Sequence, residues 1–142
     1  MEKKRFRPLF DRTYILVLAL LAFAPALLIF VLAFFEPTIL FVAVPTFLFV
    51  SYFIISSAVG YVELREKSVY IRFGFFMKRE IDYSAIRRIE KNRAFYSQSM
   101  AAIKNAMEHI DIYYNTFDVV SVSVIGNEAL MKELRVRISQ RV

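Results

Sequence analysis

The feature that most constrains this chain is a run of uncharged, mostly apolar residues from residue 13 to residue 35. A helix needs about 20 consecutive apolar residues to cross the hydrocarbon core of a bilayer, and this run is long enough. Glu36-Pro37 interrupts it, and a second uncharged stretch covers residues 38–62. Because lipid offers the backbone no hydrogen-bond partners, both stretches are predicted to be membrane-spanning helices.

The two predicted helices cover about residues 14–35 and 39–59, within a hairpin segment of residues 13–60. The connection between them is very short, so the helices are expected to be antiparallel. Pro25 and Pro45 each remove a helical hydrogen bond near the middle of a span, which predicts a kink in each helix. Packing between the helices explains such kinks, and a hinge or a weak spot for a ligand is the alternative. Neither span carries a charged residue, which argues against an ion path through this chain alone.

A secretory signal peptide is the competing interpretation of the first span. A basic start, an apolar run and Ala22-Phe23-Ala24 resemble such a signal with its cleavage site. The apolar run continues for another 11 residues after Ala24, however, and Pro25 would hinder cleavage. A retained membrane helix is therefore the preferred interpretation.

The flanking charges predict the orientation. Residues 1–12 form a basic N-terminal segment, the turn between the spans has no lysine or arginine, and cations follow the second span. Positive residues stay on the cytoplasmic side, so both termini are expected in the cytoplasm of a multi-pass protein of the cell (inner) membrane. The basic start either orients insertion only or also attracts anionic lipid, at about 1 kcal/mol per basic residue near the surface.

Residues 61–142 change from continuous apolar sequence to alternation of apolar and polar residues, which predicts β-strands in a cytoplasmic domain. The pattern predicts about six strands, listed here by residue number: 62–65, 69–73, 77–81, 86–91, 109–114 and 120–124. Turn residues separate most of these strands. Residues 92–108 fit either a loop or a helical turn.

The last segment changes period again. Asn127 is expected to be an N-cap, and Leu130, Leu134 and Ile138 repeat every four residues, which predicts an amphipathic helix. The predicted fold is therefore a membrane α-helical hairpin followed by an α+β domain. In that domain, one C-terminal amphipathic helix closes a curved antiparallel sheet of about six strands.

The order of these elements resembles a known family. After the two membrane helices come the stretches YVELREKSVYIRFG, IDYSAIRRIEKNR, HIDIYYN and DVVSVSVIGNEALMKELRVRI. Together they resemble the bacterial pleckstrin-homology-like (PH-like) membrane proteins, over most of residues 61–138. In one branch of that family a serine precedes an arginine by three residues just before the fifth strand; here Ala106 and His109 stand at those positions. The resemblance implies a PH-like domain that serves as an interaction module.

The composition excludes several kinds of chemistry. The chain has no cysteine, so disulfides, thiolate metal sites and thiol nucleophiles are impossible. His109 is the single histidine, which rules out a multi-histidine metal site, and its place on the polar face of a strand predicts a solvated side chain. The glycines are isolated, so no phosphate-binding loop is expected. We expect a protein that is not an enzyme and needs no cofactor or metal.

Basic residues are the candidate binding residues. A net charge of +6 favours anionic surroundings. The predicted contacts to an anionic surface are Lys3, Lys4, Arg5, Arg7, Arg12, Lys78, Arg79, Arg87, Arg88 and Lys91. The last five would form one positive surface if the third and fourth strands were neighbours, and the alternative is an ordinary solvated face. Nucleic acid is disfavoured as a partner because no aromatic stacking platform accompanies the charges.

The predicted function is a membrane-anchored interaction module that docks a protein partner at the inner membrane face. An exposed sheet edge would suit the addition of a peptide strand. The resemblance adds a variant, immunity-type protection against a membrane-active peptide, which some relatives of this architecture provide. Recognition of anionic lipid is the second hypothesis. Transport within a larger complex is the third, and it needs a partner that supplies polar intramembrane residues.

Overall fold

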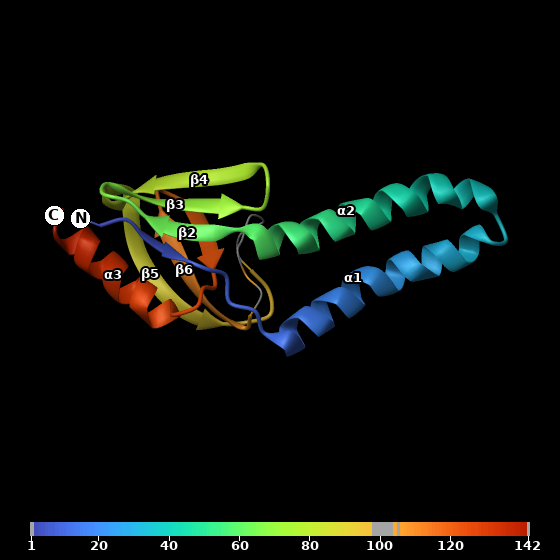
Figure 1. The fold of residues 1–142 in the computed structure, drawn as a ribbon, viewed down its shortest axis with the longest axis horizontal. Coiled ribbons are helices and arrows are strands. Elements are labelled where there is room, and N and C mark those ends of the chain that lie inside the picture. Colours follow the sequence, from blue (N-terminus) through green and yellow to red (C-terminus); the bar gives the residue numbers. More distant parts are fainter. Residues whose placement is uncertain (1, 98–103, 105, 142) are drawn as a thin grey trace.

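The computed structural model describes residues 2–97, 104 and 106–141, and in it a helical hairpin and a β-rich domain lie end to end (Figure 1). The elements in chain order are β1 (Lys4–Phe6), α1 (Arg12–Ala33), η1 (Pro37–Ile39), α2 (Leu40–Val59), β2 (Tyr61–Leu64), β3 (Ser68–Phe73), β4 (Met77–Asp82), η2 (Tyr83–Ala85), β5 (Ile86–Arg93), β6 (Glu108–Tyr114), β7 (Asp118–Val122) and α3 (Asn127–Ser139).

The hairpin consists of α1 and α2, which are antiparallel and joined through the short 3-10 turn η1, as predicted. Within the part of the chain that the structure describes, two segments are long and apolar enough to cross a membrane, Arg12–Ala33 with a mean hydropathy of 3.1 and Pro37–Ser56 with 2.3. Small side chains are the buried ones where the helices meet: Ala26, Ala33 and Ala43. Small residues allow close backbone approach between helices in lipid. Most of the large apolar side chains of the hairpin are exposed, and together the two candidate spans suggest a membrane protein.

The prolines do not end either helix. Both α1 and α2 continue through their internal prolines, Pro25 and Pro45. Pro37 occupies the first residue of η1, where its missing amide hydrogen leaves no unsatisfied acceptor. At the other end of the hairpin, Asp11 begins α1, because its carboxylate accepts a hydrogen bond of 3.0 Å from the Thr13 amide.

The domain contains two antiparallel sheets, with strand orders β1-β2-β3-β4 and β5-β6-β7. All six predicted strands are present, and β1 is a seventh that the sequence analysis did not predict. β1 pairs with β2 in the register Arg5↔Glu63 and Phe6↔Val62. The helical hairpin therefore lies in the connection between two neighbouring strands, and part of the basic N-terminal segment belongs to the sheet.

The single curved sheet that the sequence suggests is in fact divided between β4 and β5. The 3-10 turn η2 separates these strands, and the hydroxyl of the buried Tyr83 in this turn donates to the Arg65 carbonyl over 2.8 Å. This bond holds the turn against the β2–β3 connection, so the chain changes direction and β5 pairs only with β6. The sheet is not closed into a barrel.

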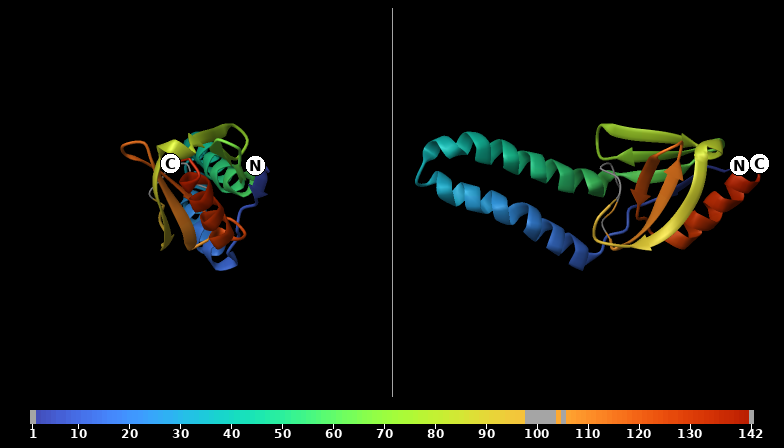
Figure 2. Two further views of the ribbon diagram at one scale, coloured as in Figure 1. Left: turned by 90° about the vertical axis from the view of Figure 1, so that its left-hand side faces the viewer. Right: turned by 180° about the vertical axis from the view of Figure 1, so that it is seen from behind.

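One hydrophobic core fills the space between the two sheets. Its side chains come from β1 to β7 and from α3, with Val62, Ile71, Ile110 and Val120 fully buried. Leu130 and Leu134 of α3 complete this core, as the four-residue repeat predicts. The helix covers the end of the domain that faces away from the hairpin (Figure 2).

The predicted N-cap of α3 was wrong by one residue. Gly126, with a φ of 85°, occupies the N-cap position and provides no side-chain cap. Asn127 lies inside the helix, and its side-chain oxygen instead accepts a hydrogen bond of 2.8 Å from the Val124 amide. Asn127 therefore fastens the start of the helix to the strand before it.

Candidate functional site

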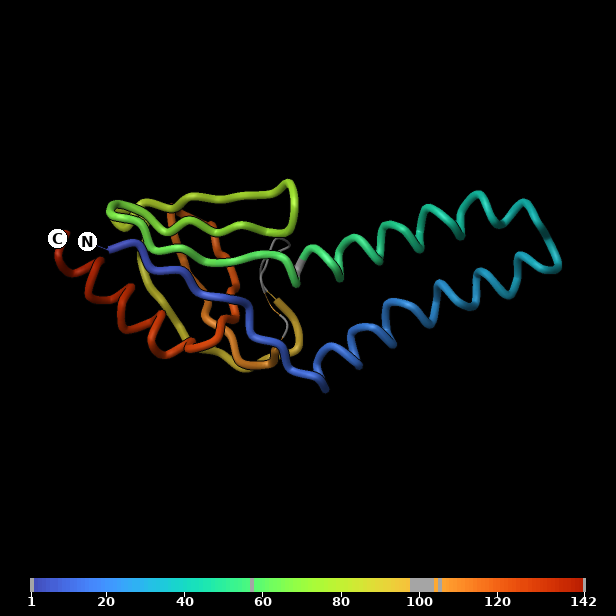
Figure 3. The backbone as a smooth tube through the Cα atoms, in the orientation of Figure 1, coloured from blue at the N-terminus to red at the C-terminus, as the bar shows by residue number. Residues whose placement is uncertain are grey.

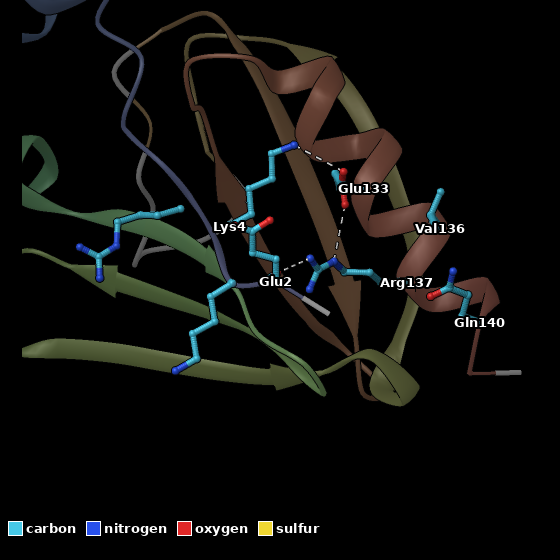
Figure 4. Close-up of a pocket in the computed structure, with 8 residues that line it drawn as sticks. Glu2, Lys4, Glu133, Val136, Arg137 and Gln140 are labelled. Atoms are coloured by element: carbon cyan, nitrogen blue, oxygen red, sulfur yellow. Dashed lines mark hydrogen bonds and ion pairs between the residues drawn. The ribbon is translucent and has the colours of Figure 1, made fainter.

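A polar groove lies between β1 and α3, at the end of the domain opposite the hairpin (Figure 4). Its volume is about 580 Å³, and its lining residues are Glu2, Lys3, Lys4, Arg5, Glu133, Val136, Arg137 and Gln140. Both chain ends lie at this end of the molecule (Figure 1). We call this feature the basic groove.

Arg137 connects the two sides of the basic groove through hydrogen bonds. Its side chain is only 5% exposed. One terminal nitrogen donates to the Arg65 carbonyl over 2.9 Å and the other to the Glu2 carbonyl over 2.8 Å. Arginine suits such a position because its planar guanidinium makes several fixed hydrogen bonds while it stays charged. Arg137 thus joins α3 to the N-terminal segment and to the connection between β2 and β3.

The guanidinium of Arg137 retains one unused donor. Its Nε is buried and makes no hydrogen bond within the described residues, and the Glu133 carboxylate lies 3.6 Å away. Figure 4 shows Arg137 between Glu2 and Glu133. Buried unsatisfied donors are uncommon, because each costs about 1–3 kcal/mol when it is left unpaired. The floor of the groove is therefore electropositive.

The exposed cations of the groove come from the N-terminal segment. Lys4 forms an exposed ion pair of 3.4 Å with Glu133 across the groove. Arg5 binds the Glu63 carboxylate at 2.9 Å, and its guanidinium stacks 4.2 Å from the centre of the Tyr61 ring. Lys3 is exposed and has no partner among the described side chains. Lys3 thus adds an unpaired positive charge to the lining of the groove.

Glu63 anchors this cationic segment from the sheet. Hydrogen bonds from Arg5 and then Arg65 hold the pKa of the Glu63 carboxyl below its ordinary value, because both stabilise the charged form. Arg65 approaches the same carboxylate at 3.1 Å. The carboxylate is therefore ionised at neutral pH and fixes β1 beside β2.

The charge of the groove suits an extended acidic segment. Its lining contains four cations, from residues 3, 4, 5 and 137, against two carboxylates, from residues 2 and 133. Flexible lysine side chains act as point charges and do not form a fixed two-pronged clamp for one phosphate. Carboxylates spaced along a peptide would match this distribution better than one compact anion.

The structure brings together only three of the ten predicted contact residues, namely Lys3, Lys4 and Arg5. Arg7 is exposed, and its backbone carbonyl accepts a hydrogen bond from Ile125. Arg12 is the first residue of α1. Arg7 therefore lies between the basic groove and the hairpin along the chain, and Arg12 lies at the start of the hairpin.

The other five predicted contacts do not lie on adjacent strands. Lys78 and Arg79 are on β4, which belongs to a different sheet from β5, so the condition for one positive surface is not met. Arg79 donates to the Tyr114 hydroxyl. Arg88 stacks 4.1 Å from the centre of the Tyr113 ring and pairs with Glu90 at 3.4 Å. These interactions already engage two of the predicted cations.

The two remaining predicted cations, Arg87 and Lys91, are also residues of β5. Lys91 pairs with Glu128 at 3.0 Å, and this pairing raises the pKa of the Lys91 amine. Arg87 and Arg88 line a separate cleft of about 220 Å³ between β5 and α3, with Arg135 on the helix side. Arg87 and Arg135 have no partners among the described residues. This cleft is smaller than the basic groove.

The expectation of a solvated His109 was wrong. His109 and Asp111 are 2% and 1% exposed, because β6 is the middle strand of its sheet and neighbouring side chains cover this face. The Nε2 of His109 lies 3.3 Å from the Asp111 carboxylate. Asp111 also accepts a hydrogen bond of 2.6 Å from Ser121 and another from Asn92. The buried carboxylate is thus fully engaged, as burial of a charge requires.

This polar cluster does not have the arrangement of a nucleophilic site. The Ser121 hydroxyl donates to Asp111, whereas a serine nucleophile needs a hydrogen bond to its histidine base. Among residues 2–97, 104 and 106–141, no three acidic or histidine side chains form a group that suits a metal ion. The geometry fits a structural role in which the cluster holds β5, β6 and β7 in register.

Arg137, the residue on which the groove depends most, was not among the predicted contacts. A signal was present, since Arg137 follows Leu134 by three residues and Leu130 by seven, and this spacing places all three on one helical face. A cation on the apolar face of a helix is a candidate for a buried, hydrogen-bonded role. The acceptors that permit this burial come from distant parts of the chain and cannot be inferred from the helix.

Comparison with known proteins identifies a family. A family model described as bacterial PH domain matches residues 60–137, more than half of the 142-residue chain. No curated protein and no solved structure matches the chain.

Proposed function

Because the chain belongs to the bacterial PH domain family, we propose that it is a membrane-anchored binding module that docks an acidic segment of a partner protein in the basic groove. PH domains are generally interaction modules without catalytic activity, and this sets the class of function. We propose three further points: that the partner is a protein, that its acidic segment binds in the groove, and that binding takes place at the inner membrane face.

The position of the groove is the observation that supports a protein partner. The basic groove and the hairpin are at opposite ends of the molecule (Figure 1). If the hairpin crosses the bilayer, headgroups of that bilayer lie at the other end of the domain from Lys3 and Lys4. An acidic protein segment in the adjacent solution can reach these lysines. The cations of the groove would also speed its association.

The orientation is part of the proposal. Both ends of the hairpin join the domain, and the basic residues around these ends favour the cytoplasmic side. The termini and the basic groove would then be in the cytoplasm, with the Glu36 turn on the outer face.

Photo-crosslinking in native membranes tests the proposal. A photoreactive residue would replace Val136, which lines the basic groove and is 44% exposed. The control would carry it at Phe117, which is 90% exposed in the β6–β7 turn. We expect the Val136 position alone to capture a protein with an acidic segment. The double variant Lys3→Gln, Lys4→Gln should lose that product.

Three outcomes would contradict protein docking in the groove. A crosslinked product that contains only this chain would show that no partner protein binds there. A product that persists in the double variant would show that binding does not depend on the lysines of the basic groove. Crosslinking to lipid alone would favour the alternative, recognition of anionic lipid.

Protection against a membrane-active peptide is the remaining alternative. Such peptides commonly carry lysine and arginine on their polar face, and a groove with excess positive charge would repel them. Expression in a peptide-sensitive cell without a gain in survival would count against this role.

A further inference from the structure

The turn between β3 and β4 exposes a group of large apolar side chains. Phe75 is 49% exposed, Phe76 is 83% exposed and Met77 is 53% exposed. The rings of Phe75 and Phe76 are 6.5 Å apart. Adjacent exposed aromatic residues at the tip of a short turn have a cost in water and mark a surface that something apolar covers.

This turn is held against α2. Gly74 has a φ of +66°, and a Cβ built on it would lie 2.9 Å from the Cα of Ser56. The Phe76 ring stacks on Tyr52 with centroids 6.5 Å apart and an angle of 23° between the planes. Figure 3 shows the turn beside the end of the helix that leads into β2. These contacts fix the position of the aromatic residues along the axis of α2.

This position along the helix axis is within the apolar part of the hairpin. The candidate span in α2 is Pro37–Ser56, so Tyr52 and Ser56 both belong to its last turns. The turn approaches α2 at these two residues, through Phe76 at Tyr52 and through Gly74 at Ser56, so it would lie at the boundary between hydrocarbon and headgroups once the span is in a bilayer. Aromatic residues are enriched at this boundary.

Two cations flank the aromatic group on the side of the domain. Arg72 and Lys78 are paired residues of β3 and β4, one register position beyond Phe73 and Met77. The guanidinium of Arg72 donates to the Gly74 carbonyl over 3.2 Å, which stiffens the turn. Lys78 is exposed. Cations directly outside a membrane-inserted segment meet the anionic headgroups, and each contributes about 1 kcal/mol.

We propose that the β3–β4 turn is a second membrane contact, in which Phe75 and Phe76 insert into the leaflet interface and Arg72 and Lys78 bind anionic headgroups. This inference rests on the proposed membrane anchoring of the hairpin. Its consequence is that the domain is fixed against rotation on its anchor, so the basic groove stays directed away from the lipid.

Tryptophan fluorescence tests the inference directly, because the chain contains no tryptophan. The full chain would be placed in nanodiscs that contain anionic lipid, as three single-tryptophan variants. Phe76→Trp reports on the turn and Phe49→Trp on the middle of α2. Phe117→Trp is the matched control, an exposed aromatic turn residue at the opposite end of β6 from Glu108. Quenching would be measured with lipids brominated on their acyl chains and with aqueous iodide.

We expect brominated lipid to quench Phe49→Trp and Phe76→Trp, and iodide to quench Phe117→Trp only. Iodide quenching of Phe76→Trp, with normal lipid quenching of Phe49→Trp, would overturn the inference and leave the membrane anchor intact. Loss of lipid quenching in Phe49→Trp would overturn the anchor itself. A Phe76→Trp variant shielded from both quenchers would mean that protein covers the turn, which also contradicts the inference.

Discussion

At the scale of single residues, Gly74 allows the β3–β4 turn to lie close to the helical hairpin. A side chain at this position would meet the backbone of Ser56 in α2, and the positive φ adds backbone strain. Gly126 also has a positive φ, of +85°, but a Cβ there would lie 3.7 Å from Ala129, which is ordinary contact. A comparison of alanine substitutions at these two glycines therefore distinguishes the effect of backbone strain from the effect of a steric clash.

We expect Gly74→Ala to destabilise the protein more than Gly126→Ala. Both variants have the strain of a left-handed residue, roughly 1–2 kcal/mol, and only the first must also displace the turn from α2. Thermal unfolding of the full chain in detergent, followed by circular dichroism, measures the difference. Equal losses in the two variants would show that the contact with Ser56 contributes nothing.

Residue types were easier to predict than residue burial. The sequence identified Lys3, Lys4 and Arg5 as binding candidates, and the structure gathers them in one groove. It also predicted a solvated His109, which is buried beside Asp111. Alternation along a strand shows which residues share a face, but it does not reveal whether neighbouring strands cover that face. Arg137 escaped notice for a related reason, because its acceptors are backbone carbonyls far away in sequence.

At the scale of elements, β1 is one part of the fold that the sequence could not predict, and the division of the sheet between β4 and β5 is another. The other six strands follow from alternation of apolar and polar residues, and α3 follows from its four-residue repeat. β1 has only three residues, and its burial pattern has a single buried position, Phe6. Its partner β2 follows the whole hairpin in the chain. Because the two strands are so far apart in the sequence, their pairing produces no recognisable pattern in the residues around β1.

Glu63→Gln should loosen β1. The carboxylate binds Arg5 and Arg65, and its pKa is held below the ordinary value, so its contribution is present above pH 4.5 and disappears as the pH falls through the lowered pKa. We expect the variant to lose about 1 kcal/mol at neutral pH, and to show less acid destabilisation than wild type. Amide hydrogen exchange of β1 and melting temperatures across a pH series measure both effects.

Glu66→Gln is the matched control, because Glu66 is an exposed carboxylate in the adjacent turn and its side chain has no partner among the described residues. It should keep the exchange rates and the acid response of the wild type. If Glu63→Gln behaved in the same way, the ion pairs of Glu63 would not be what fastens β1.

At the scale of the whole molecule, the hairpin and the domain form one connected unit. The hairpin lies between β1 and β2, which pair with each other, and Gly60 alone separates α2 from β2. The basic groove is at one end of the domain, and the exposed aromatic turn beside α2 is at the other. This arrangement supports the proposal that the hairpin anchors the domain and that the basic groove faces the solution next to the membrane.

The most direct test of this account is the sidedness of the hairpin turn and the groove. Because the chain has no cysteine, Glu36→Cys and Gln140→Cys each provide a single thiol, which a membrane-impermeant maleimide can label in intact and in permeabilised cells. The account predicts that Glu36→Cys reacts in intact cells and that Gln140→Cys reacts only after permeabilisation. Reaction of Gln140→Cys in intact cells, or of Glu36→Cys only after permeabilisation, would contradict it.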